Sequence, residues 1–187
     1  MITVLTPTLP ERAPLFAQLA ESMALQTLAP QRWLVEWDYA KRGPVAVIND
    51  LARHVTTPWL FPFADDDVLE HDHFDTLKPY LTDDVDIVYS WCRIEGVKVH
   101  GSSFQTDFDA DRLRNENYIP APACIRTSLW HDLGGYRPPG SYQQPGGTEH
   151  EDWDLWLRAL DAGARFRCVP IITWTYRMND QWSHVSL

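Results

Sequence analysis

The alternation of short apolar runs with amphipathic segments over the first third of the chain constrains its fold more than any other feature. Residues 2–5 form an apolar run rich in β-branched side chains, and similar runs occupy residues 33–37 and 59–64. Between these runs, up to about residue 26 and again over residues 45–55, apolar residues recur every three or four positions, as on one face of a helix. This β-α-β-α-β order is typical of a parallel sheet with helices on its faces. We therefore predict an α/β fold with a mostly parallel central sheet.

The rest of the chain continues with shorter elements and more loop. We expect helices over residues 73–81, 129–133 and 152–162, and strands over residues 87–94, 123–126, 166–169 and 171–175. Residues 96–117 are loop-rich, and residues 134–147 are so rich in glycine and proline that we predict a mobile loop there. The 187 residues contain no repeat and no linker, which predicts one domain over residues 1–187.

Composition excludes some classes of function. The 16 basic and 26 acidic residues give a net charge of −10, which argues against broad binding of nucleic-acid phosphates. We find no apolar run near the roughly 20 residues that span a bilayer, and from residues 1–5, which have no basic segment or long apolar run, we expect no signal peptide. The three cysteines are isolated, as is usual in a reducing compartment. We expect a cytoplasmic protein without a membrane span, in which most of the nine tryptophans pack in the core.

Two segments have the spacing of a helix capping box. Thr8 and Glu11 precede the first predicted helix, and Thr148 and Glu151 precede the last one. Capping accounts for Glu151 but leaves Asp152 free. A carboxylate on a fixed helix end beside a glycine-rich loop suits a general base.

Polar residues follow each of the first three predicted strands: Thr6-Pro7-Thr8, Glu36-Trp37-Asp38 and Asp65-Asp66-Asp67. In an open α/β sheet, ligands bind beyond the carboxyl ends of the strands. Three successive carboxylates repel one another, so we expect a cation beside them, and Mg²⁺ or Mn²⁺ prefers such oxygen ligands. The alternative is an acidic turn that caps the next helix, with Asp67 or Asp72 as the cap.

Several stretches stand out in order along the chain: residues 2–8, Phe61 to Leu69, Leu133-Gly134-Gly135-Tyr136, Glu151 to Arg158, and Trp174-Thr175-Tyr176-Arg177 with Ser183. Taken together, these stretches resemble the family 2-like glycosyltransferases of the GT-A fold over nearly the whole chain. Each is weak alone, but their order makes the match specific. The resemblance implies a metal-dependent, inverting transfer of sugar from a UDP- or GDP-sugar to a hydroxyl of a glycan, lipid, protein or other acceptor. It also implies a nucleotide-binding half over residues 1–70 and an acceptor and catalytic half over residues 71–187.

Carried over to matching positions, the resemblance implies a donor site and a base. Asp152 would be the base, and Glu151 would orient the acceptor or cap its helix. Asn49 would face the donor, or else be an exposed polar residue of its helix. The glycines at 134 and 135 would let the backbone approach the sugar. The nucleotide would be held by Thr6, Pro7 and Thr8, with Glu36 or preferably Asp38 at the base and Gly135 near the sugar.

The acidic triplet corresponds to the DxD motif of the family, which holds the metal and the donor diphosphate. Ala64 stands where many relatives have the first aspartate, so the resemblance implies either Asp66 with Asp67, or Asp65 with Asp67, as metal ligands. His184 would be a further metal ligand or simply a solvated residue.

A second departure follows residue 38, where the family's usual Asp-Asp-Gly-Ser turn is missing. In its place Lys41 or Arg42 would contact phosphate.

Three other classes remain open. A nucleotidyltransferase would also use carboxylate-bound metal, but the stretch from Thr6 to Pro10 lacks a glycine-rich or basic triphosphate signature. The tryptophans and acidic loops would also suit a non-catalytic carbohydrate- or metal-binding module. A relative that has lost its activity is the third class.

Overall fold

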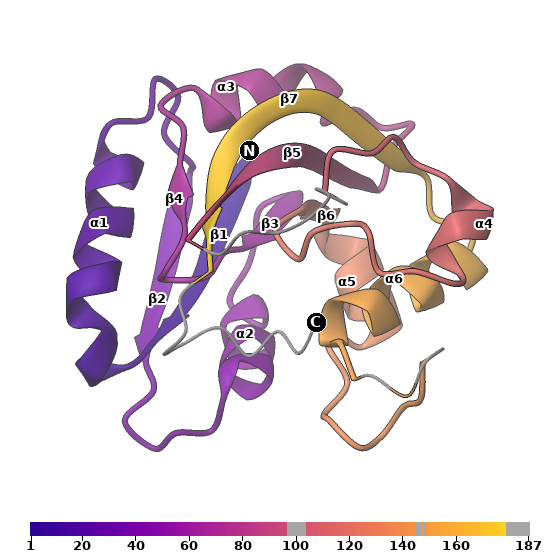
Figure 1. The fold of residues 1–187 in the computed structure, drawn as a ribbon, viewed down its shortest axis with the longest axis horizontal. Coiled ribbons are helices and arrows are strands. Elements are labelled where there is room, and N and C mark those ends of the chain that lie inside the picture. Colours follow the sequence, from indigo (N-terminus) through magenta and orange to yellow (C-terminus); the bar gives the residue numbers. More distant parts are fainter. Residues whose placement is uncertain (97–103, 145–146, 148, 179–187) are drawn as a thin grey trace.

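The computed structural model describes residues 1–96, 104–144, 147 and 149–178 (Figure 1). One seven-stranded sheet runs through them in the order β2-β1-β3-β6-β5-β7-β4. β1 is parallel to β2 and β3, and β5 is parallel to β7, whereas β6 and β4 pair antiparallel with their neighbours. The predicted α/β class is confirmed. The strands are β1 (Ile2–Thr8), β2 (Arg32–Trp37), β3 (Trp59–Pro62), β4 (Val68–Leu69), β5 (Ile87–Glu95), β6 (Cys124–Arg126) and β7 (Phe166–Arg177).

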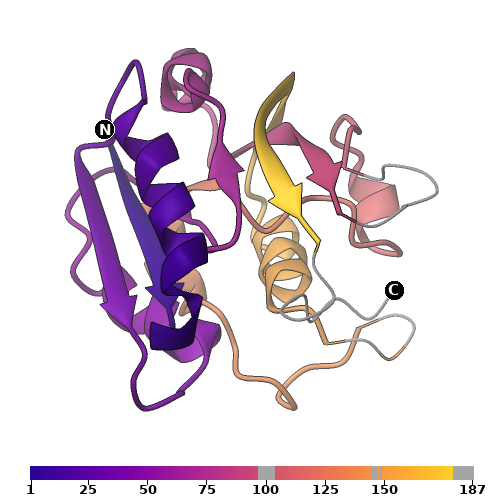
Figure 2. The same ribbon diagram turned by 60° about the vertical axis from the view of Figure 1, so that its left-hand side comes forward.

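Helices cover both faces of this sheet (Figures 1 and 2). Neighbouring residues of β1 point to opposite faces, so that Val4 packs with Leu19 on one side while Leu5 packs with Val47 on the other. No helix in the described ranges is long and apolar enough to cross a membrane. The helices are α1 (Ala13–Ala24), α2 (Pro44–Ala52), α3 (His73–Leu77), α4 (Ala110–Leu113), α5 (Thr127–Leu133) and α6 (Glu151–Asp161), with the 3₁₀ turns η1 (Pro10–Arg12) and η2 (Lys78–Tyr80).

The last two predicted strands are one strand with a bend. β7 continues through Pro170, and its register against β5 shifts there: Ser90 pairs with Val169, whereas the next residue, Trp91, pairs with Ile172. Proline has no N–H for the ladder, so a sheet tolerates it at such an irregularity. The arched strand brings its end beside β4, where Val68 pairs with Thr175.

Both predicted capping boxes are wrong. Thr8 belongs to β1, and α1 begins only at Ala13 without a side-chain cap. His150 is the residue before α6, so Glu151 is the first helical residue and not the third. Thr148 lies outside the described residues. The spacing of a capping box alone did not locate either helix start.

Candidate active site

The end of β1 is tied to the acidic triplet by a short hydrogen bond. Thr8 Oγ1 donates to Asp65 Oδ2 at 2.6 Å, and both side chains are buried. Because β1, β2 and β3 are parallel, their carboxyl ends lie on one side of the sheet, and the arrowheads of β2, β5 and β7 all point to that lower side in Figure 2. The triplet follows β3 there.

The positive charge that lies beside the triplet in this structure is the guanidinium of an arginine. Arg12, in η1, places Nη2 2.5 Å from Asp65 Oδ1 and 2.7 Å from Asp66 Oδ2, and its Nε donates to Asp65 Oδ2 at 3.1 Å. Burial raises the pKa of Asp65, and the Thr8 hydroxyl and the Arg12 charge act in the opposite direction. Both oxygens of Asp65 are therefore already engaged by protein groups.

The last residue of β7 holds Asp67 in place. The backbone N–H of Arg177 donates to Asp67 Oδ1 at 2.9 Å, and the Arg177 guanidinium donates to the carbonyl oxygen of Asp66 and to Gln18. Burial and then the charge of Asp66 raise the pKa of Asp67 well above its ordinary value. The bend in β7 thus delivers Arg177 to the triplet.

The remaining carboxylate oxygens fit a hard divalent cation. Asp66 is paired with Arg12 through Oδ2, and Asp67 accepts the Arg177 N–H through Oδ1. Within the described part of the chain, no group of three or more His, Cys, Asp or Glu side chains is arranged to hold a metal. Mg²⁺ and Mn²⁺ commonly take one or two carboxylates and complete their shell with phosphate and water. Such a cation fits here if substrate phosphate shares its coordination. His184 lies outside the described residues.

A second acidic group stands at the start of α6. Asp152 Oδ1 accepts hydrogen bonds from Asn117 Nδ2 at 3.2 Å and from the backbone N–H of Trp153 at 2.7 Å. Burial and then the neighbouring Glu151 carboxylate raise the pKa of Asp152 to about 7. A carboxylate that exchanges its proton near neutral pH matches the requirement for a general base.

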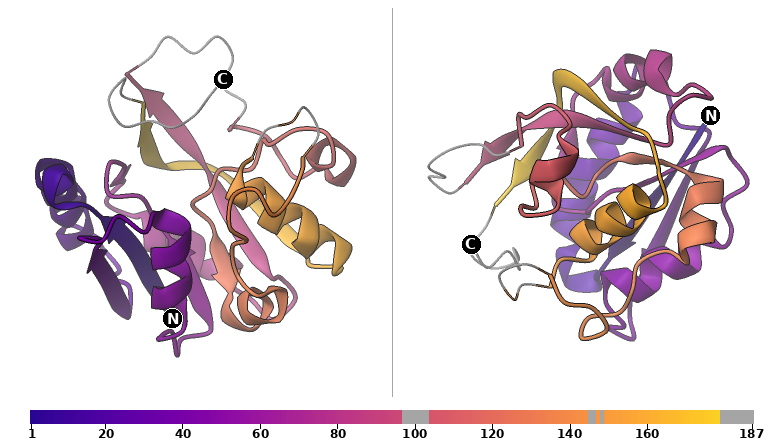
Figure 3. Two further views of the ribbon diagram at one scale, coloured as in Figure 1. Left: turned by 90° about the horizontal axis from the view of Figure 1, so that it is seen from below. Right: turned by 90° about the vertical axis from the view of Figure 1, so that its right-hand side faces the viewer.

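Both acidic groups act on one phenol. Burial and then the charges of Asp67, Asp66 and Asp152 raise the pKa of Tyr176 to about 12. Seen from below, α1, β1 and β2 lie on one side of the molecule and α5 and α6 on the other (Figure 3, left).

At the end of β2, one oxygen of Asp38 is buried without a hydrogen bond. Asp38 Oδ2 accepts from the Gly43 N–H at 2.8 Å, while Asp38 Oδ1 lies 3.7 Å from Arg42 Nε and accepts no hydrogen bond from the described residues. A buried acceptor without a hydrogen bond calls for an explanation, and a ligand N–H is one. Glu36 instead forms an ion pair with Arg42.

Lys41 and Arg42 are both engaged by carboxylates. Lys41 Nζ lies 2.9 Å from Glu11 Oε1, and Arg42 contacts Glu36 and Asp50. In this structure the cationic groups of Lys41 and Arg42, which were expected to contact phosphate, pair with carboxylates.

Three residues expected at the donor have structural partners instead. Thr6 is fully buried, and its hydroxyl accepts the indole N–H of Trp33 at 3.0 Å, while Pro7 beside it is partly exposed. Asn49 is bonded to the backbone of Tyr136 in both directions, at 2.8 and 3.0 Å. A Cβ on Gly135 would come within 2.4 Å of Asn49 Oδ1, so the absence of a side chain at this glycine makes room for Asn49.

Sequence reasoning missed the groups that hold the carboxylates. Arg12, Arg177 and Asn117 were given no role, although Arg177 falls in one of the matched stretches. Arg12 could have been found from its place just after the first strand, where ligands gather. Asn117 lies in a stretch without periodicity and offers no such signal.

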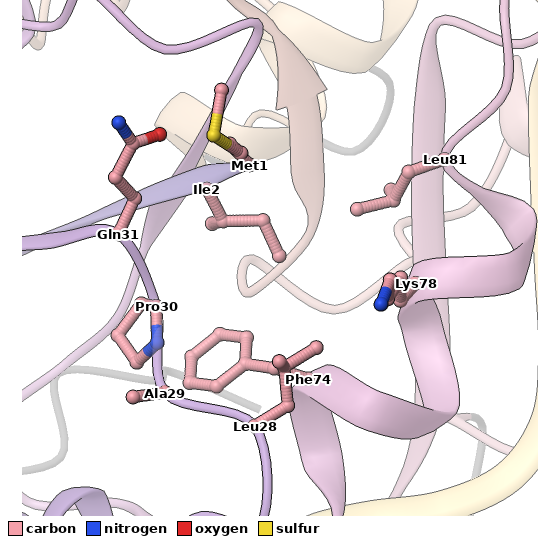
Figure 4. Close-up of a pocket in the computed structure, with 9 residues that line it drawn as sticks. All are labelled: Met1, Ile2, Leu28, Ala29, Pro30, Gln31, Phe74, Lys78 and Leu81. Carbon is pink, nitrogen blue, oxygen red and sulfur yellow. The ribbon is translucent and has the colours of Figure 1, made fainter.

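A separate apolar hollow of about 210 Å³ lies elsewhere (Figure 4). Met1 and Ile2 line it at the start of β1, whereas Thr8 and the acidic triplet are at the other end of that strand. The hollow is therefore not part of the candidate site.

Comparison with known proteins identifies the fold. No family model and no curated sequence matches the chain. Among solved structures, S. aureus TarS 1–349 in complex with UDP-GlcNAc matches with a TM-score of 0.75 and 14% identity, covering 98% of this chain and 61% of TarS 1–349. The mannosyltransferase PcManGT from Pyrobaculum calidifontis, in complex with GDP-Man and Mn²⁺, matches with a TM-score of 0.68 and 14% identity, covering 97% and 58%. The chain thus spans about three fifths of each neighbour and has the GT-A glycosyltransferase fold.

Proposed function

We propose that this chain transfers a sugar from a nucleoside-diphosphate sugar to an acceptor hydroxyl, with a divalent cation and with inversion at the anomeric carbon. The fold, shared with one protein bound to UDP-GlcNAc and another bound to GDP-Man and Mn²⁺, supports the class of reaction. The observation that carries the proposal is the acidic triplet at the carboxyl ends of the parallel strands, where Thr8 and Arg12 hold Asp65 and the Arg177 N–H holds Asp67. We propose that a cation at this triplet and the base Asp152 serve one bound substrate.

The nucleotide would lie across the ends of β1 and β2. Asp38 Oδ1 is buried, lies 3.7 Å from Arg42 Nε and accepts no hydrogen bond from the described residues, which supports a contact to a base that offers an N–H, as uracil and guanine both do. We therefore propose UDP- or GDP-sugars as donors.

Asp66 and Asp67 would hold Mn²⁺ or Mg²⁺ through carboxylate oxygens other than Asp66 Oδ2, which pairs with Arg12, and Asp67 Oδ1, which accepts the Arg177 N–H. When bound, such a cation neutralises the charge that develops on the departing diphosphate. Thr8 and Arg12 fix Asp65, and the Arg177 N–H fixes Asp67, so the chain itself holds the segment in place.

Asp152 would accept the proton of the acceptor hydroxyl. As this oxygen bonds to the anomeric carbon, the bond from that carbon to the diphosphate oxygen breaks, and the proton passes to the carboxylate. Asn117 and the Trp153 N–H hold Asp152 Oδ1 and leave Oδ2 for this proton. A single displacement of this kind inverts the anomeric centre, and the base contributes about 10²–10⁴-fold.

Product analysis tests the proposal. The protein is incubated with UDP-GlcNAc or GDP-Man, with Mn²⁺ or EDTA, and with glycan, lipid or protein acceptors. We expect Mn²⁺-dependent release of nucleoside diphosphate, lost in Asp66→Ala and kept in Asp132→Ala, which changes an exposed aspartate of α5. Release of pyrophosphate would instead indicate a nucleotidyltransferase. Binding of free sugar without any effect of nucleotide would indicate a carbohydrate-binding module.

A further inference from the structure

Arg12 is wedged between two carboxylates of the acidic triplet. Its Nη2 atom lies 2.5 Å from Asp65 Oδ1 and 2.7 Å from Asp66 Oδ2, and only 13% of its side chain is exposed. Burial alone would lower the pKa of Arg12, but the Asp66 and Asp65 charges raise it above its ordinary value. A full positive charge is therefore built into this segment before any ligand arrives.

This charge has opposite effects on the two ligands of the proposed reaction. The Arg12 guanidinium pairs with Asp66 Oδ2, and its charge therefore reduces the negative potential that attracts a divalent cation. The same charge attracts a diphosphate. Arg177 is the second arginine at the triplet, but it contacts Asp67 through its backbone N–H and Asp66 through that residue's carbonyl oxygen. Arg12 is thus the guanidinium that directly pairs with the carboxylates in the described structure.

We infer that Arg12 is a positioning residue that sets the balance between the two ligands, weakening the binding of free divalent cation and strengthening the binding of nucleoside diphosphate. The inference rests on the proposed function. It differs from a purely structural role in the sign of its effects. An arginine that only held Asp65 and Asp66 in shape would, when removed, weaken the binding of both ligands.

The test compares the whole chain with Arg12→Gln. Mn²⁺ binding without nucleotide is followed by the electron paramagnetic resonance signal of free Mn²⁺, and UDP or GDP binding in EDTA by calorimetry. A neighbouring charge changes the proton affinity of a carboxylate by one to three powers of ten. On that scale we expect Arg12→Gln to bind Mn²⁺ about tenfold more tightly and the nucleotide about tenfold more weakly. Arg12→Lys, which keeps the charge, should move both affinities less.

Arg53→Gln is the matched control, since Arg53 is 75% exposed and pairs with Asp50 outside the triplet. It should leave both affinities unchanged. Thermal unfolding checks that each variant is folded, and Arg12→Met is a second neutral variant if Arg12→Gln is not. Weaker binding of both ligands, or no change in either, overturns the inference while the wild type still binds nucleotide. A wild type that binds neither Mn²⁺ nor nucleotide overturns the proposed function and this inference with it.

Discussion

At the scale of single residues, the raised pKa of Asp152, the proposed base, has a cost in stability. Its pKa is raised from 3.8 to about 7 in the folded protein, so the folded state binds more protons than the unfolded state between these values. Stability is therefore lost through this group as the pH rises from about 4 to 7. Asp152→Asn should raise the Tm at pH 8 relative to wild type and leave it little changed near pH 4, while kcat falls about 10²–10⁴-fold.

The matched control is Asp161→Asn, at the exposed end of the same helix, where Asp161 pairs with Arg114. It should change neither kcat nor the pH dependence of the Tm. Normal transfer by Asp152→Asn, with donor still bound, would contradict the assignment of the base.

The pH profile is a second prediction for this residue. A base must be unprotonated, so kcat/KM should rise through pH 7 as Asp152 loses its proton. Asp152→Asn should lose this limb, which initial rates from pH 5.5 to 8.5 would measure. A wild-type profile that is flat across this range would exclude Asp152 as the titrating base.

At the scale of an element, the turn after α5 depends on one of its two glycines more than on the other. Gly134 and Gly135 have φ values of +75° and +71°, so alanine at either is strained by about 1 kcal/mol or more. A Cβ on Gly134 would meet nothing within 4 Å, whereas one on Gly135 would press on Asn49 and Trp130. Urea unfolding should show Gly135→Ala to be less stable than Gly134→Ala by about 1–3 kcal/mol. Equal losses would show that the Asn49 contact does not limit this turn.

Helices and strands could be predicted from the sequence where the apolar run or the helical periodicity extends over several residues. The apolar runs of β1, β2 and β3 and the periodic face of α6 gave their positions, and Gly163 after α6 has the positive φ expected of a helix end. β4 has two residues and α4 has four, which is too short for any periodicity. Pro170 marked a break in the sequence, yet β7 passes through it because the register shift accommodates the missing N–H.

At the scale of the whole molecule, ligand binding should stabilise the fold by mass action. UDP or GDP with Mn²⁺ at about 100 times the Kd would add about 2.7 kcal/mol to the free energy of unfolding. For a protein of this size we expect a rise in Tm of roughly 5–10 °C. Differential scanning fluorimetry measures it, with the nucleoside monophosphate and Asp66→Ala as controls that should give smaller shifts. No shift with either diphosphate would count against the donor class.

The site could be predicted only in part because its halves are far apart in sequence. The carboxylates of the triplet and Asp152 stand out by type and place. Their partners do not, since Arg12 is 53 residues from Asp65 and Arg177 is 110 residues from Asp67. Only the folded structure shows that two arginines contact the triplet, for which the sequence led us to expect a metal cation alone.

The contact between Arg177 and the triplet has a consequence for synthesis on the ribosome. Residues 65–67 emerge when more than half of the described chain is still unmade, and β4 then has no strand to pair with. The nascent chain must carry these carboxylates in water, where they are well hydrated, until β7 is translated and docks. We therefore expect this end of the sheet to be completed among the last steps of folding, although residues 65–67 are made early.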